Sequence, residues 1–258
     1  MKKPKNNRKG QVAIWVILAL VLAAAIILFF ALERLPLGIQ AAEFEPAKSV
    51  EGCIKESIAE AVSKMLPQGG FIQPKNFVSY NRTNIEYLCE NPYYFSPCTS
   101  QHPMLISEMN REIKEYILPF VEECFEGMRE EAERRGYSVE MKEMNLSVEM
   151  APGRIYARIS REFSTSRSGV SKITSDFDSE VLSPAYELAN VAMEIAASEA
   201  KYCYFESVGY MLEFPQFDIR KTALSTPVRI YSIKDTKTGA AMNIAIRSCA
   251  IPAGMGLK

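Results

Sequence analysis

The sequence is poor in the residues that most metal sites and acid–base centres need. It holds a single histidine, His102, and a single tryptophan in 258 residues. None of its six cysteines forms a Cys-x-x-Cys pair, so a zinc site with the usual ligand spacing is not expected. A Gly-rich phosphate loop is also missing, since Gln68-Gly69-Gly70 lacks the strand–loop–helix context. We therefore expect no metal, no cofactor and no enzymatic activity.

Two short motifs invite an enzymatic interpretation that their context does not support. Ser198-Glu199-Ala200-Lys201 and Lys237-Thr238-Gly239 match two signatures of penicillin-binding serine enzymes. However, Ser198 lies late in its expected helix, the intervening Ser-x-Asn element is missing, and the two motifs are too close together. Residues 237–239 fit a hairpin turn, where glycine supplies a positive φ. Asp176 and Asp178, with Glu180, are candidates for a cation site, but acids before a helix are more typical of helix capping.

The chain has no excess of positive charge, which argues against anionic binding partners. The chain has 30 basic and 31 acidic residues, and five of the basic ones lie in the first ten positions. Beyond those ten positions, 25 basic residues face 31 acidic ones, a net charge of −6. A nucleic acid or a broad anionic lipid surface would need a basic face, so neither is expected as a partner of the outer domain.

One long stretch contains no charge, glycine or proline. It runs from Val12 to Leu32, 21 residues, and a helix of that length spans roughly 30 Å, the thickness of a bilayer core. A cleaved secretory signal is a poorer fit because its apolar run is usually only ~7–15 residues long. Basic residues stay on the cytoplasmic side, and the five cations precede the span. We expect a cytoplasmic tail at 1–10, a transmembrane signal-anchor helix at 11–34 contacting the lipid bilayer, a linker at 35–45, and an extracytoplasmic domain at 46–258.

The junction Arg8-Lys9-Gly10-Gln11 resembles the archaeal class III signal of type IV pilin-like proteins. The resemblance covers about 25 residues and implies cleavage after Gly10, which would leave the helix that starts at Gln11 for filament packing. Trp15 stands where that family often has an acid that pairs with a neighbouring subunit. More broadly, this opening is similar to that of membrane-anchored proteins of small-genome archaea. We favour a permanent anchor over a processed filament subunit.

Six cysteines follow the apolar stretch, and an even number in an exported domain suggests up to three disulfides. Of the 15 connectivities that six cysteines allow, the favoured one joins two helices, closes one turn-rich segment and ties a helix end to the last strand. Its pairs are Cys53–Cys124, Cys89–Cys98 and Cys203–Cys249. Two sequons, at Asn81 and Asn145, are candidate glycosylation sites and fit an exported chain.

Hydrophobic periodicity predicts a disulfide-stabilised α+β domain with antiparallel strands and helices packed on one face. Helices are expected at about 46–66, 103–135 and 183–205, with hairpins between and after them. One expectation is that the domain divides into a helical part, 46–136, and an α+β part, 137–258. Aromatic residues in 93–95 and 202–217 either fill the core or form a recognition surface.

These features favour a non-catalytic, membrane-anchored protein in cell-surface interaction, adhesion or envelope assembly. Its expected partners are the bilayer, through residues 11–34, and other surface or envelope proteins. Two alternatives stay open: a type IV pilin-like filament subunit processed between Gly10 and Gln11, and an extracytoplasmic enzyme without a recognisable motif.

Overall fold

The computed structural model describes residues 18, 20–30, 45–91, 93, 96–225 and 227–249. The chain divides into two compact units, Met1–Phe44 and Glu45–Lys258. In the first unit the described residues are helical, and their apolar side chains are exposed. No helix in the described part of the chain is both long enough and apolar enough to cross a membrane. The basic tail, the junction at Gly10 and Gln11, the linker and much of the expected span lie outside the described residues.

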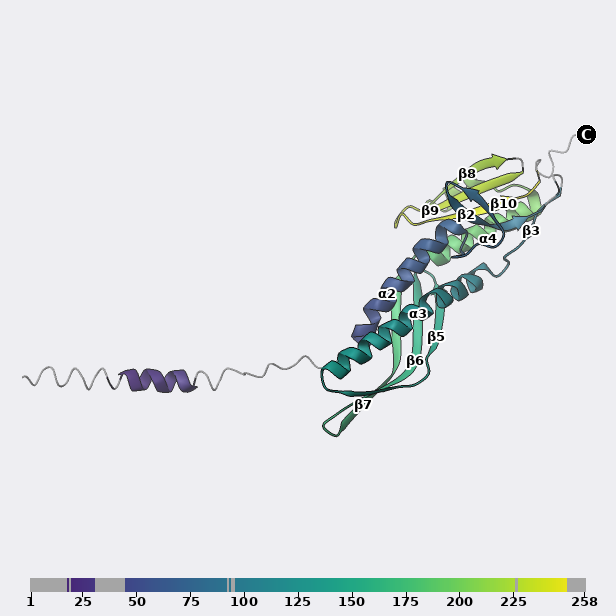
Figure 1. Ribbon diagram of the computed structural model, residues 1–258. Helices are drawn as coiled ribbons and strands as arrows, with labels where there is room; N and C mark the ends of the chain where they lie inside the picture. The colour runs from purple at the N-terminus through teal and green to yellow at the C-terminus, as the bar shows by residue number, and fades with distance from the viewer. Residues whose placement is uncertain are drawn as a thin grey trace, which may run out of the picture. The chain divides into compact units, whose positions relative to one another are not determined.

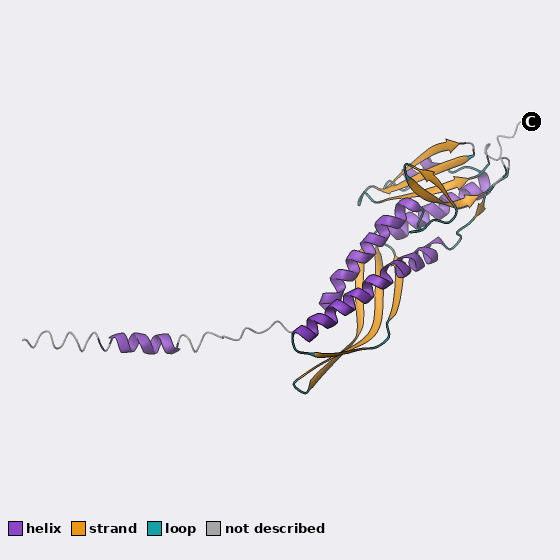
Figure 2. Cartoon of the chain, viewed as in Figure 1, coloured by secondary structure: helices purple, strands orange, loops and turns teal. Residues whose placement is uncertain are grey.

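The second unit contains helices and two sheets, drawn in Figures 1 and 2. Its helices are α2 (Pro46–Met65), the short 3-10 helix η1 (Leu66–Gln68), α3 (Leu105–Arg134), α4 (Ala185–Tyr202) and α5 (Ser207–Glu213). Its strands are β1 (Phe77–Tyr80), β2 (Thr83–Glu90), β3 (Thr99–Ser100), β4 (Ser138–Met141), β5 (Asn145–Ala151), β6 (Arg154–Arg167), β7 (Val170–Leu182), β8 (Phe217–Ser225), β9 (Val228–Asp235) and β10 (Ala241–Arg247). The expected α+β class with packed helices is confirmed.

The first sheet has the strand order β1-β2-β10-β9-β8, with β3 paired to β2. Strands β2 and β10 run parallel, with Ala245 opposite Tyr87. The expectation of antiparallel strands throughout is therefore wrong for this pair, and the sheet is mixed. Hairpin signals in a sequence report only neighbouring strands, whereas this pair joins strands from opposite ends of the unit. Helix α4 packs against β2, β9 and β10.

The second sheet is antiparallel, with β6 in the centre and β4, β5 and β7 paired to it. Helices α2 and α3 pack side by side along it, as Figure 2 shows. Alternate strand residues are buried because successive side chains of a strand point to opposite faces. On α3 the buried positions recur every three or four residues, the period of a helix with one apolar face. These buried positions are Leu105, Met109, Ile113, Ile117, Val121, Phe125, Met128 and Ala132.

Three disulfides cross-link the unit, and none of its cysteines is free. Cys53–Cys124 joins α2 to α3 with 6.3 Å between the Cα atoms. Cys89–Cys98 ties β2 to the segment before β3, and Cys203–Cys249 ties the end of α4 to the residues after β10. These are the three pairs that the sequence favours.

Candidate functional site

Glu199, in the last turn of α4, is the buried centre of a polar cluster. Its side chain is 0% exposed, Arg229 Nη1 donates to its Oε2 at 2.7 Å, and the Tyr231 hydroxyl donates to its Oε1. Burial, followed by the negative charge of Glu199, raises the pKa of Tyr231 well above its ordinary value. The cluster thus ties α4 to β9.

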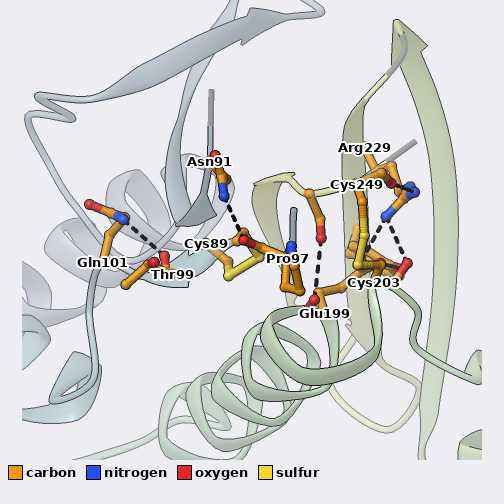
Figure 3. Close-up of a disulfide and its surroundings, with 12 residues drawn as sticks. Cys89, Asn91, Pro97, Thr99, Gln101, Glu199, Cys203, Arg229 and Cys249 are labelled. Carbon is orange, nitrogen blue, oxygen red and sulfur yellow. Dashed lines mark hydrogen bonds and ion pairs between the residues drawn. A yellow bond between two sulfur atoms is a disulfide. The ribbon is translucent and has the colours of Figure 1, made fainter. Parts of the chain in front are cut away.

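The same arginine holds the Cys203–Cys249 disulfide in place, as Figure 3 shows. Arg229 donates to the carbonyl oxygens of Cys203 and Cys249 at 3.2 and 2.7 Å. The Ser248 hydroxyl donates to the carbonyl of Glu199 at 3.2 Å. These contacts fix the end of α4 against β9 and the residues that follow β10.

The residues of the two enzyme-like motifs take part in local structure. Ser198 Oγ donates to the carbonyl of Tyr204 at 2.8 Å, and the Lys201 ammonium lies over the ring of Tyr202. Thr238 belongs to the β9–β10 turn, where its backbone N–H donates to Asp235 Oδ2 at 3.1 Å. Gly239, at φ 79°, closes that turn in the left-handed region.

His102 lies between two carboxylates near the start of α3. Its Nδ1 is 2.6 Å from Glu108 Oε2, and its Nε2 is 3.5 Å from Glu86 Oε1. Burial lowers the pKa of His102, but hydrogen bonds to Glu86 and Glu108 outweigh it, so the pKa is raised above its ordinary value. Buried Glu86 also accepts the backbone N–H groups of Lys75 and Asn76. The cluster fastens the 71–76 loop to β2 and α3.

The acids considered for a cation lie on an exposed face of β7 rather than before a helix. Asp176 and Asp178 are exposed, and Glu180 pairs with Arg154 at 2.7 Å. In the part of the chain that the structure describes, no group of three or more histidine, cysteine or acidic residues could hold a metal ion.

The sequons and the aromatic segments lie at several separate places. Asn81 is exposed in the β1–β2 turn, and Asn145 is exposed at the start of β5. Tyr93 is exposed, whereas residues 94 and 95 lie outside the described residues. In the segment 202–217, Phe205 and Phe217 belong to the core, while other members are exposed. The aromatic residues thus divide between core and surface.

A largely apolar groove surrounds residues 182–184, which link β7 to α4. We name it the Leu182 groove; it consists of two adjoining concavities of 470 and 560 Å³ that share Leu182, Ser183 and Pro184. Leu182 itself is 79% exposed. The first concavity is lined by α2, η1 and the start of β10, through Ala59, Val62, Ser63, Leu66, Pro67, Val181, Ala240 and Ala241. The second is lined by Gly153, Glu187, Gln216, Phe217, Asp235, Lys237 and Thr238.

The polar side of the groove is held in place by its own hydrogen bonds. Glu187 Oε1 accepts the N–H of Gly153 at 2.7 Å, and the N–H of Ser183 donates to the Gly153 carbonyl at 3.0 Å. The other carboxylate oxygen of Glu187 is buried and has no hydrogen-bond partner among the described residues. The groove therefore offers an apolar floor together with one fixed acceptor that is not used internally.

Sequence reasoning missed this groove because its walls come from distant segments. Residues near 60, 153, 183, 216 and 238 meet there, and no local pattern brings them together. The signal that could have been noticed is the unusual run Val181-Leu182-Ser183-Pro184, an apolar strand end directly before a helix start.

No family model, no curated protein and no solved structure matches this chain.

Proposed function

We propose that this chain is a membrane-tethered, non-catalytic interaction protein outside the cytoplasm, and that the Leu182 groove binds a partner protein of the cell surface or envelope. The observation that carries the proposal is the exposed Leu182 between two apolar concavities. An exposed apolar patch with a polar rim is the arrangement typical of a protein interface.

The chemistry of the groove favours a polypeptide as its occupant. Apolar side chains of a partner can fill the concavities, while the free Glu187 oxygen can accept a hydrogen bond from an N–H group. Lys237, from the β9–β10 turn, adds a cation to the same rim. A buried acceptor left without a partner costs free energy, so a donor supplied by a bound chain would be stabilising.

The disulfides support a location outside the cytoplasm. All six cysteines are paired, and disulfides persist mainly in oxidising compartments. The five N-terminal cations followed by an uncharged run of 21 residues support the same orientation from the sequence.

The titratable clusters support a non-catalytic role. The pairs Glu199–Arg229 and His102–Glu108 are each engaged at hydrogen-bond distance in contacts that fasten one element to another. A general acid or base instead needs a proton-carrying group that reaches a substrate position.

Protease accessibility tests the orientation. In intact spheroplasts, an added protease should remove a C-terminal epitope and leave an epitope placed before Met1 protected. In inverted membrane vesicles the pattern should reverse. Protection of the C-terminal epitope in spheroplasts would overturn the proposed location.

Site-specific photocrosslinking tests the groove. A photoreactive residue at Leu182, in cells that natively express the chain, should give one discrete adduct that mass spectrometry identifies as a surface or envelope protein. The same residue at Leu212, which is 81% exposed on α5, should not give that adduct.

Paired arginine variants make the crosslinking test specific. Ala59→Arg places a bulky cation in the groove and should weaken the Leu182 adduct at least about tenfold. Ala197→Arg changes an exposed alanine of α4 outside the groove lining and should leave the adduct unchanged. An adduct that is equally strong in both variants would refute the groove as the binding surface.

A second candidate, a type IV pilin-like subunit, rests on the junction Lys9-Gly10-Gln11. It requires removal of residues 1–10, whereas the tether proposal expects them to remain. Intact mass of the protein extracted from native membranes separates the two, because only the processed form begins at Gln11.

A further inference from the structure

The hairpin of β6 and β7 ends in a tight two-residue turn. Ser168 and Gly169 both adopt positive φ, 52° and 82°, the geometry that matches the natural twist of a hairpin. Beside the turn, Val170 is 74% exposed and Ile173 is 62% exposed. We name residues 167–173 the β6–β7 tip. Val170 and Ile173 are both β-branched and apolar, and both are exposed at the end of the hairpin.

Both sides of the tip combine an apolar residue with polar neighbours. Val170 lies opposite Arg167, and Ile173 lies opposite Ser164. Lys172 lies opposite Thr165, on the same side as Val170. Apolar side chains with flanking cations suit the boundary between acyl chains and headgroups, where the cations remain among the phosphates.

The tip lies at the end of the unit where α2 begins, as Figure 1 shows. Helix α2 packs along β7. Lys48, and to a smaller extent Lys172 of the tip, lower the pKa of Glu45, the residue directly before α2. Glu45, the first residue of this unit, therefore lies close to the β6–β7 tip.

The expected linker is short. Residues 35–45 can span at most about 40 Å when fully extended. A tether of this length gives the tip an effective concentration at the membrane in the range of about a millimolar, so a weak contact is enough to be populated.

We infer that the β6–β7 tip contacts the lipid surface of the membrane that holds residues 11–34. This inference rests on the proposed tether. Beyond the first ten residues the chain carries a net charge of −6, which opposes broad contact with an anionic surface. The contact is therefore confined to the tip, with Val170 and Ile173 entering the interface. It fixes the orientation of the domain on the membrane.

Depth-dependent quenching of tryptophan fluorescence tests the inference. Trp15, the only tryptophan, is replaced by phenylalanine, and Val170→Trp is introduced in the full chain. The protein is reconstituted into phosphatidylcholine vesicles with or without brominated acyl chains. The brominated lipid should reduce the fluorescence of the Val170→Trp chain at least about twofold, because a tryptophan at the tip would reach the interface.

A matched control is Leu212→Trp in the same Trp15→Phe chain, since Leu212 is equally exposed but lies on α5 against the other sheet. It should be quenched little. Adding Ile173→Asp to the Val170→Trp chain should restore most of the fluorescence, because a carboxylate is disfavoured in the apolar interface.

Flotation of the same samples tests the membrane tether separately from the contact of the β6–β7 tip. A chain that fails to float with the vesicles overturns the tether itself. A chain that floats, with Val170→Trp quenched no more than Leu212→Trp, leaves the tether intact and overturns the contact of the β6–β7 tip.

Discussion

The buried Glu199 side chain forms an ion pair with Arg229, and the loss of this pair should destabilise the fold. Glu199 is completely buried and bound by Arg229 and Tyr231. Removing one partner of a buried ion pair leaves an uncompensated charge in a poorly solvated place. The sequence shows Glu199 only as a member of a serine–lysine motif, because its partners lie 30 and 32 residues away along the chain.

We expect Arg229→Met to lower the free energy of unfolding by about 3–5 kcal/mol, because Glu199 remains buried without its cation. Urea unfolding of the full chain in detergent, followed by circular dichroism, measures the loss. Arg220→Met is the matched control, since its pair with Asp218 is exposed and should cost at most about 1 kcal/mol. Equal losses in the two variants would show that the Glu199 cluster does not stabilise the fold.

His102 predicts a pH dependence of stability. Its pKa in the folded state lies above the ordinary value of 6.5 because two carboxylates hold its proton against the effect of burial. The stabilisation is therefore fully present below pH 6.5 and is lost as the pH rises through the folded-state pKa. Urea unfolding at about pH 5.5 and about pH 8.5 should show a stability difference between the wild type and His102→Gln that shrinks at the higher pH. A difference that grows with pH would contradict this assignment.

At the scale of elements, helical periodicity predicts much of what is observed. The expected helices at 46–66 and 103–135 correspond to α2 and α3, and Pro119 lies within α3 without ending it. The expected helix at 183–205 is shorter, because Cys203 adopts a left-handed φ of 60° and ends α4. The parallel pairing of β2 with β10 and the walls of the Leu182 groove could not be predicted, since both depend on contacts between distant segments.

The disulfide between α2 and α3 should contribute more than the one beside β3. Cys53–Cys124 closes a separation of 71 residues and Cys89–Cys98 one of 9. A disulfide stabilises the folded state by restricting the unfolded chain, and more so when the closed loop is longer. Replacing both cysteines with serine should therefore lower the free energy of unfolding by about 4 kcal/mol for Cys53–Cys124 and about 3 kcal/mol for Cys89–Cys98. Thermal unfolding of both variants side by side shows which of the two loses more stability. A smaller loss from the long loop would contradict the entropic explanation.

At the scale of the whole molecule, all six cysteines are expected to be unreactive because each is in a disulfide. Because all six are paired, the native protein should resist alkylation in denaturant until a reductant is added. Full reduction should then raise the intact mass by about 6 Da, two hydrogens for each disulfide. Six thiols alkylated without reductant, in protein kept from air and from exchange, would show that the domain carries no disulfides.

The parallel pairing of β2 and β10 would set an order of folding events in the proposed export of the domain. If the segment behind the proposed anchor is exported first, β2 emerges early and β10 nearly last, yet β10 lies between β2 and β9. The first sheet can close only after almost the whole chain has emerged, and such long-range contacts form slowly. Cys89 and Cys98 can meet well before Cys249 arrives. Maturation should therefore pass through a partly oxidised intermediate in which β10 has not yet paired between β2 and β9. This intermediate exposes unpaired strand edges and is the state most prone to aggregation.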